Sequence, residues 1–191
     1  MGKIKYLTQV RDFCKKTPVV SLSSLKKIIG KNKDYVYPML NNLVKHGELQ
    51  RITKGAYSMF DDPILIVFCL KPAYLGLQEA LSLHNLWEQE TNVVLLTTKI
   101  VRKGVRSVFG NNVIVKRLPP AYFFGFEYKQ YVDWYVPVSD IEKTFIDMIY
   151  FQQPMDNDLI KQFKKRIDSK KLRMYLQRYP KEIREKVLKI I

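Results

Sequence analysis

Residues 40–52 read LNNLVKHGELQRI, and residues 53–57 continue with TKGAY. The apolar residues Leu40, Leu43 and Val44 recur at helical spacing, and Gly47 follows at a position where helices commonly end. Beyond this glycine, apolar and polar residues alternate on both sides of the turn at residues 53–55, as they do in two paired strands. The passage therefore predicts a helix that leads directly into a β-hairpin.

Two more helices are predicted upstream of this passage. Apolar residues recur at helical spacing from residue 4 to residue 14, and proline soon ends that pattern. A second helix follows within residues 21–30, where serines supply the cap and a glycine closes the last turn. The third helix contains Pro38, which is tolerated in a first turn, so we expect this helix to begin at residue 34 or 35.

Three helices followed by a hairpin is the winged arrangement, and residues 40–52 with residues 54–57 resemble the passage from recognition helix to wing in winged helix regulators. We expect residues 1–60 to form a winged helix-turn-helix that binds double-stranded DNA, and the turn signal DDP at residues 61–63 to end it. The expected fold class is α+β. The winged helix is followed by a mixed α/β domain, residues 61–191, which ends in basic helices over residues 153–191.

The net charge of +15 favours a polyanionic partner, and its distribution is uneven. Residues 1–60 contain 12 Lys or Arg against 3 Asp or Glu, and residues 153–191 contain 12 against 5. Residues 61–152 are nearly neutral, with 9 against 10. Both ends of the chain are therefore candidates for contact with nucleic acid.

Seven side chains of the amino-terminal module are candidate DNA contacts: Lys33, Tyr35, Tyr37, Asn41, Lys45, Arg51 and Lys54. The first four lie off the apolar stripe of the predicted recognition helix and are placed to read bases or to hold the backbone. The last three are better placed for phosphates. The alternative is a protein-binding module whose lysines only keep the surface hydrated.

A second basic face is predicted on the carboxy-terminal helices, comprising Lys161, Lys164, Lys165, Arg166, Lys170, Lys171 and Arg173. Serine at position 169 is the expected cap of the middle helix of this segment. A solvated surface and a second nucleic-acid contact are equally open interpretations of this face.

The middle of the chain is predicted to alternate strands with one helix. Strands are expected over residues 64–70, 93–98, 113–118, 122–128 and 135–138. A helix is expected over residues 74–86, and it should pack His84 against the core. Within it, residues 73–86, the strand at 93–98 and VSDIEKTFID at residues 138–147 resemble the AbiEi family. The resemblance implies an amino-terminal winged helix, an antitoxin domain, repression of the protein's own operon at promoter repeats, and neutralisation of a nucleotidyltransferase-like toxin.

The sequence offers few groups for catalysis or metal binding. Cys14 and Cys69 are not paired in spacing, so we expect buried thiols and neither a disulfide nor a metal site. Glu142 and Asp147 do not share a helical face, and serine at position 139 with Glu142 fits a capping box instead. We therefore expect no enzyme, no cofactor and no catalytic residue.

The expected function is that of a cytoplasmic DNA-binding repressor and antitoxin, since no apolar stretch approaches the length of a membrane span or a signal peptide. Two alternatives stay open: a nuclease-like defence enzyme targeted by a winged helix, and a transcription factor without a toxin. Both a dimer and a monomer bound at two sites would suit an operator with repeats.

Overall fold

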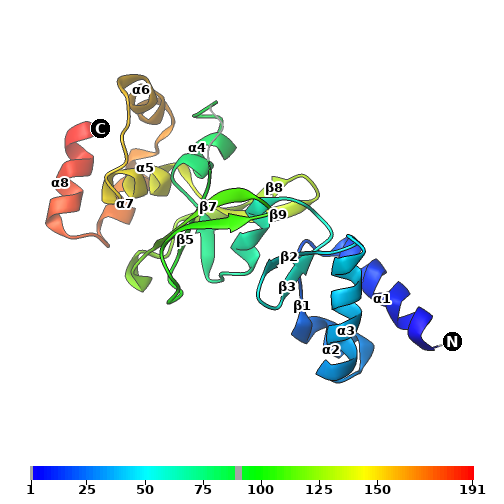
Figure 1. Cartoon of the computed structure of the whole chain (residues 1–191). Coiled ribbons are helices and arrows are strands. Elements are labelled where there is room, and N and C mark those ends of the chain that lie inside the picture. The colour runs from blue at the N-terminus through cyan, green and yellow to red at the C-terminus, as the bar shows by residue number, and fades with distance from the viewer. Residues whose placement is uncertain (1, 89–91) are drawn as a thin grey trace. The chain divides into compact units, whose positions relative to one another are not determined.

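The computed structural model of this chain describes residues 2–88 and 92–191. The chain forms two compact units, Met1–Cys69 with Ser107–Asn111, and Leu70–Arg106 with Asn112–Ile191. The fold is mixed α/β, with helices beside a three-stranded and a six-stranded sheet (Figure 1). None of the helices within the described ranges combines the length and the apolar character that a membrane crossing requires.

The first unit contains the helices and the hairpin that the sequence predicts. Its elements are α1 (Gly2–Lys16), β1 (Val20–Ser21), α2 (Leu22–Ile29), α3 (Lys33–Lys45), β2 (Gln50–Thr53), β3 (Ala56–Ser58) and the 3₁₀ helix η1 (Pro63–Phe68). Strand β3 lies between β1 and β2 and is antiparallel to both. Helix α2 begins where Ser21 Oγ accepts a hydrogen bond from Ser24 N, and Gly30 ends it at a positive φ of 66°.

Helix α3 begins earlier than expected. Its first residue is Lys33, because Asn32 caps the helix by accepting a hydrogen bond from Tyr35 N at 3.2 Å. Pro38 therefore lies in the second turn, where it has no N–H to offer to the carbonyl of Asp34. The apolar stripe of the helix compensates, since Val36 and Leu40 are completely buried in the core of this unit.

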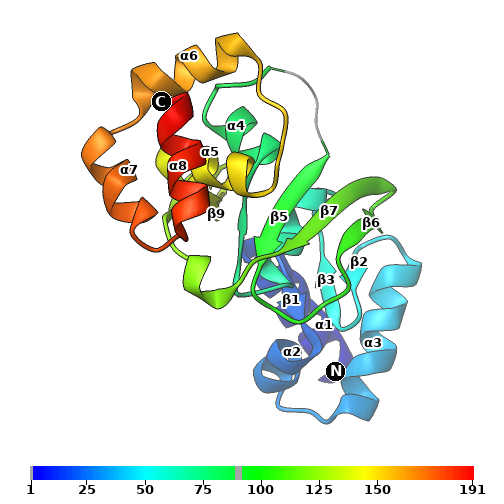
Figure 2. The same ribbon diagram turned by 90° about the vertical axis from the view of Figure 1, so that its left-hand side faces the viewer.

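The second unit is built on a mixed sheet in the order β6-β7-β5-β4-β9-β8. The strands are β4 (Ala73–Leu75), β5 (Val93–Thr97), β6 (Gly104–Val108), β7 (Asn111–Arg117), β8 (Phe126–Tyr131) and β9 (Trp134–Ser139). The other elements are α4 (Gln78–Leu83), η2 (Pro120–Tyr122), α5 (Ile141–Tyr150), α6 (Asn157–Arg166), α7 (Ser169–Leu176) and α8 (Lys181–Ile190). Helix α5 contacts α6, α7 and α8 as well as β9 (Figure 2).

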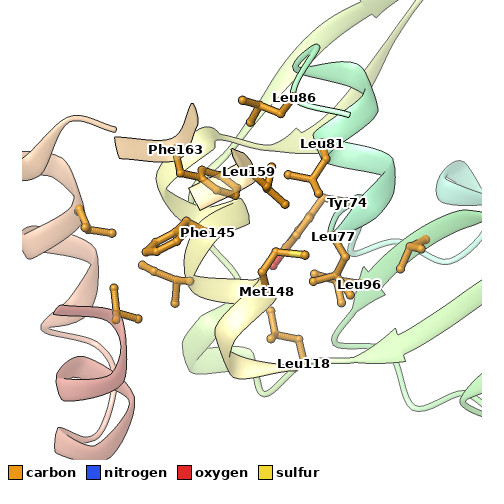
Figure 3. Packing of buried hydrophobic residues seen from close by; sticks show 14 of the residues in the cluster. Tyr74, Leu77, Leu81, Leu86, Leu96, Leu118, Phe145, Met148, Leu159 and Phe163 are labelled. Carbon is orange, nitrogen blue, oxygen red and sulfur yellow. The ribbon is translucent and has the colours of Figure 1, made fainter. Parts of the chain in front are cut away.

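The core of the second unit forms where α4, α5 and the carboxy-terminal helices meet the sheet (Figure 3). Leu77 and Leu81 from α4 and its amino-terminal cap meet Phe145 from α5 in this cluster, and all three are completely buried. Phe163 of α6 packs against Phe145, with ring centroids 4.9 Å apart. The amphipathic stripes of the predicted carboxy-terminal helices thus face the sheet domain rather than solvent.

Three expectations for the middle of the chain are wrong. Residues 64–70 form no strand, because Asp62 caps η1 and Pro63 occupies its first turn. Residues 74–86 are not one helix, because Tyr74 and its neighbours pair with β5 before α4 begins. The strand expected over residues 122–128 begins only at Phe126, because η2 ends at Tyr122 and residues 123–125 lie outside any strand. In addition, strand β6 was not expected at all. An uninterrupted apolar run has no periodicity that separates a strand from a helical turn, so tertiary pairing decides such segments.

Two expected helix caps are each displaced by one residue. Helix α5 is capped by Asp140 rather than Ser139, because Ser139 still pairs with β8 in the sheet. Helix α7 is capped by Asp168 rather than Ser169, and the Asp168 carboxylate accepts hydrogen bonds from two backbone N–H groups of the first turn. In both places an aspartate adjacent to the serine, Asp140 after Ser139 and Asp168 before Ser169, supplies the stronger, charged acceptor.

His84 follows α4 and is buried, as the sequence predicts. Its Nε2 lies 2.7 Å from the carbonyl oxygen of Ser139, and its Nδ1 lies 3.2 Å from Nζ of Lys129. A neutral ring satisfies both contacts, with Nε2–H donating and Nδ1 accepting. Burial, opposed in part by the Ser139 carbonyl, lowers the pKa of His84. The ring is therefore a neutral link between α4 and β9.

This link predicts a pH-dependent stability. Below the pKa of about 6.5 of an unfolded histidine, the unfolded chain binds a proton that folded His84 resists, so the free energy of unfolding should fall as the pH falls. Replacing His84 by Gln should flatten the profile between about pH 7 and pH 5. Both tryptophans, Trp87 and Trp134, lie in the second unit, so their fluorescence during urea unfolding measures this effect. The matched variant His46→Gln, at an exposed position of the first unit, should keep the wild-type profile.

Candidate nucleic-acid interface

Helix α3 divides the candidate DNA contacts between two sides. Lys33, Tyr37 and Asn41 recur every four residues and are exposed, and Lys45 continues this face at the end of the helix. The side chain of Tyr37 is 42% exposed, which is unusual for a large aromatic residue and leaves its ring and hydroxyl available to a ligand. The buried stripe of α3 fixes the rotation of the helix, so this polar face points to solvent.

A groove of about 620 Å³ lies beside this face. Four of the seven predicted contacts line it, namely Lys33, Tyr37, Arg51 and Lys54. The rest of its lining is Leu22, Asp34, Pro38, Gly55 and Tyr57. The turn between β2 and β3 thus lies opposite the first half of α3, and cations border the groove on both sides. Such a groove offers phosphate contacts from the turn and base contacts from the helix.

The structure places Tyr35 away from this groove. Tyr35 is half-buried, and its ring meets the ring of Tyr6 in α1 edge-on, with centroids 5.7 Å apart. It lines a separate cavity of about 390 Å³ between α1 and α3. Tyr35 and Tyr37 are two positions apart in sequence, and this spacing turns their side chains to different sides of a helix. Tyr35 is therefore positioned to hold α1 against α3.

The groove is lined by one acidic residue, Asp34, against three cations. Of the three acidic residues among residues 1–60, Glu48 accepts two hydrogen bonds from Arg11, at 2.6 and 2.7 Å. This contact lowers the pKa of Glu48, with the Arg11 hydrogen bond as the main cause. Asp34 and Tyr57 also line the groove, although neither was among the seven predicted contacts. The position of Asp34 in the first turn of the predicted recognition helix is the signal that could have identified it.

The second basic face is only partly available. Lys171 forms ion pairs with Asp140 at 3.1 Å and with Glu142 at 2.9 Å, so its charge is used inside the unit. Arg166 donates a hydrogen bond to the carbonyl of His84 at 2.7 Å, and Lys161 pairs with Asp158 at 3.0 Å. The remaining members are exposed: Lys164, Lys165, Lys170 and Arg173. The face that can meet a polyanion is therefore smaller than the sequence predicts.

Glu142 and Asp147, the carboxylates weighed for catalysis, are both engaged in structure. Glu142 accepts a hydrogen bond from Asp168 N at 2.8 Å in addition to its ion pair with Lys171. Asp147 is completely buried and accepts a hydrogen bond from Tyr74 Oη at 2.8 Å. Within the part of the chain that the structure describes, no three His, Cys, Asp or Glu residues gather in a way that could hold a metal ion.

The partner of Asp147 is Lys143, one turn earlier on α5, and both side chains are completely inaccessible to solvent. The Lys143 ammonium donates to Asp147 and lies 5.4 to 5.8 Å from the ring centroids of Phe124, Tyr74 and Tyr179. The rings complete the solvation of the cation through their π faces. Burial raises the pKa of Tyr74 well above its usual range, so this residue is a donor to Asp147. This cluster stabilises the fold and is closed to substrate.

The two cysteines differ in environment. Cys14 is buried in the core of the first unit, and burial raises the pKa of its thiol to about 11. Cys69 is half-buried, and its thiol lies 3.9 Å from the carbonyl oxygen of Leu65. The expectation of two buried thiols is thus confirmed for Cys14 and too strong for Cys69.

Comparison with known proteins yields a fold and no family. A scan against protein-family models finds no match, and neither does a search of curated proteins. Among solved structures, the crystal structure of the RV2827C protein from Mycobacterium tuberculosis is similar, with a TM-score of 0.61 and 14% sequence identity. The match covers 97% of this chain and 77% of that chain. At this identity the likeness shows a shared fold alone.

The two tyrosines of α3 provide a matched test of the groove. Tyr37→Phe removes a hydroxyl from the groove, and we expect it to weaken duplex binding by about 0.5–1.5 kcal/mol, the value of one hydrogen bond. Tyr35→Phe removes the same atom on the other side of the helix and should leave the affinity unchanged. Fluorescence anisotropy with a labelled duplex measures both. Equal losses in the two variants would contradict the assignment of the groove.

The buried ion pair makes a second prediction. Lys143→Met leaves the Asp147 carboxylate buried without its cation, and we expect it to lower the free energy of unfolding by about 3–5 kcal/mol. The double variant Lys143→Met with Asp147→Leu removes both charges and should be more stable than Lys143→Met alone. Urea unfolding followed by tryptophan fluorescence compares the two. A double variant as unstable as the sum of its single variants would show that the two charges do not interact.

Proposed function

We propose that this protein is a DNA-binding transcriptional repressor and antitoxin whose first 60 residues form a winged helix-turn-helix. The observation that carries the proposal is the groove between α3 and the β2–β3 turn, which is lined by Lys33, Tyr37, Arg51 and Lys54. In this reading α3 is the recognition helix and enters the major groove, while the β2–β3 hairpin is the wing and reaches flanking phosphates.

Three further observations support DNA as the ligand. The element order of the first unit, three helices followed by a hairpin whose sheet includes β1, is compatible with a winged helix. Residues 1–60 contain 12 basic and 3 acidic residues, an excess that suits a polyanion. Asn41 is exposed on the same face as Tyr37, and an asparagine there can pair with an adenine edge through two hydrogen bonds.

The antitoxin role rests on the AbiEi resemblance of residues 73–86, 93–98 and 138–147. Much of the last of these segments is buried: Lys143, Thr144 and Asp147 are completely inaccessible. These residues support the fold of the second unit, so the neutralising surface would lie elsewhere on it. A nuclease-like function is less well supported, because the carboxylates it would need are paired and buried.

The wing cations provide the first test. Charge reversal of Arg51 and Lys54 should weaken binding to all duplexes alike and reduce the slope of log affinity against log salt by about 2, whereas Asn41→Ala should change the preference among sequences. Electrophoretic mobility shifts on the promoter region of the protein's own gene and on unrelated duplexes compare the variants. A wild-type protein without salt-dependent affinity for any duplex would overturn the proposal.

The antitoxin role has a separate readout. Co-expression with a nucleotidyltransferase-like toxin from the neighbouring gene should restore growth, and the Arg51 and Lys54 reversal should keep this rescue while losing repression. If co-expression does not restore growth while repression is intact, the function is that of a transcription factor without a toxin.

A further inference from the structure

The nearly neutral middle of the chain conceals a strongly basic segment. Residues 92–126 contain six Lys or Arg and no Asp or Glu. The ten acidic residues that balance the middle all lie outside this segment, in residues 61–91 and 127–152. The cations of residues 92–126 and the acidic residues on either side nearly cancel when they are counted together. The charge count over residues 61–152 therefore did not reveal this third concentration of cations.

The fold of the second unit gathers these six cations at one end of the sheet. Strands β5 and β7 are parallel, with Thr97 beside Arg117, so residues just after β5 emerge at the same end as the last residues of β7. Strand β6 neighbours β7 and is preceded directly by Arg102 and Lys103 (Figure 2). The set, here called the basic sheet end, is Lys99, Arg102, Lys103, Arg106, Lys116 and Arg117.

The side chains of the basic sheet end are largely exposed to solvent. Lys99, Arg102, Lys103 and Arg117 are exposed, and Arg106 and Lys116 are half-exposed. Arg106 donates to the backbone carbonyl of Arg102 at 2.8 Å, which holds the Arg106 guanidinium beside the segment that precedes β6 without neutralising its charge. Among the described residues, none of the ion pairs involves Arg102, Lys103 or Arg117. Their mutual repulsion is relieved when an anionic partner binds.

The geometry favours a ladder of phosphates as that partner. Arg117 ends β7, and Arg102 and Lys103 directly precede β6, so cations from two neighbouring strands, which lie about 4.8 Å apart, come together at this end. Three of the six cations are arginines, whose planar guanidinium groups bind phosphate oxygens through two hydrogen bonds. A group of cations with no acidic residue among them suits contact with a nucleic-acid phosphate backbone.

We propose that the basic sheet end binds the phosphate backbone of duplex DNA as a second contact, in addition to the groove beside α3. The inference rests on the proposed function, because it takes the same DNA as its ligand. It assigns to the second unit a direct share of the affinity, and its contacts are independent of base sequence.

The test compares two variants of equal charge. The first replaces Arg102, Lys103, Arg106 and Arg117 by Gln, and the control replaces four exposed cations of α8 by Gln: Lys181, Arg184, Lys186 and Lys189. We expect the first variant to bind duplex at least tenfold more weakly between about 50 and 200 mM salt, with the salt slope reduced by about 2 to 4. The control should stay close to the wild type. Tryptophan fluorescence during thermal unfolding checks that the second unit of each variant is folded.

The possible outcomes separate this inference from the proposed function. If Arg51 and Lys54 reversal abolishes binding while the first variant matches the control, the groove binds DNA and the inference is wrong. If the first variant loses affinity while the Arg51 and Lys54 reversal has no effect, the basic sheet end binds DNA and the groove does not. Tighter binding of the wild type to phosphatidylserine vesicles than to duplex, lost in the first variant, would assign the site to a lipid surface and overturn the inference.

Discussion

The second unit depends on a lysine and an aspartate buried together one helical turn apart. Lys143 and Asp147 project from α5 into the place where the sheet and the carboxy-terminal helices meet, and Tyr74 joins them from β4. A buried charge without a partner is costly, so each of these groups fixes the position of the others. Gly125 shows how tight the packing is, since a Cβ there would lie 2.8 Å from Tyr175 and 3.0 Å from Lys143. The polar cluster thereby selects one arrangement of α5 against its neighbours.

The same cluster explains a stretch of sequence that otherwise suggests chemistry. Residues 138–147 contain two aspartates, a glutamate, a lysine and a threonine in a short space, a composition often found in active sites. Asp140 caps α5, Glu142 holds the start of α7, and Lys143 pairs with Asp147. Each charged side chain has a structural partner, so the motif secures the helices of the second unit. The proposed function therefore rests on the exposed cations.

Those cations are distributed in a way that fits nucleic acid. The groove beside α3 combines an exposed tyrosine with lysine and arginine, whereas the basic sheet end consists of lysine and arginine alone. Such a division between base-reading and backbone-binding surfaces is common in DNA-binding proteins. The carboxy-terminal face offers less free charge than its sequence suggests, because Lys171 and Arg166 have partners within the unit.

The sequence by itself determined the helices and hairpin of the first unit, the carboxy-terminal helices and the excess of positive charge. These features follow from local rules, because a helix with one apolar stripe or a turn with glycine has the same preference in any context. Only the tertiary structure decided that the apolar run at residues 64–70 contributes to η1 instead of a strand and that residues 73–75 form β4. It also decided which lysines are exposed to a ligand in solution. An apolar run takes its form from the strand or helix it pairs with, and a lysine is free or paired according to residues far away in sequence. Lys171 and Glu142, 29 positions apart, show that no local pattern could have revealed such a pair.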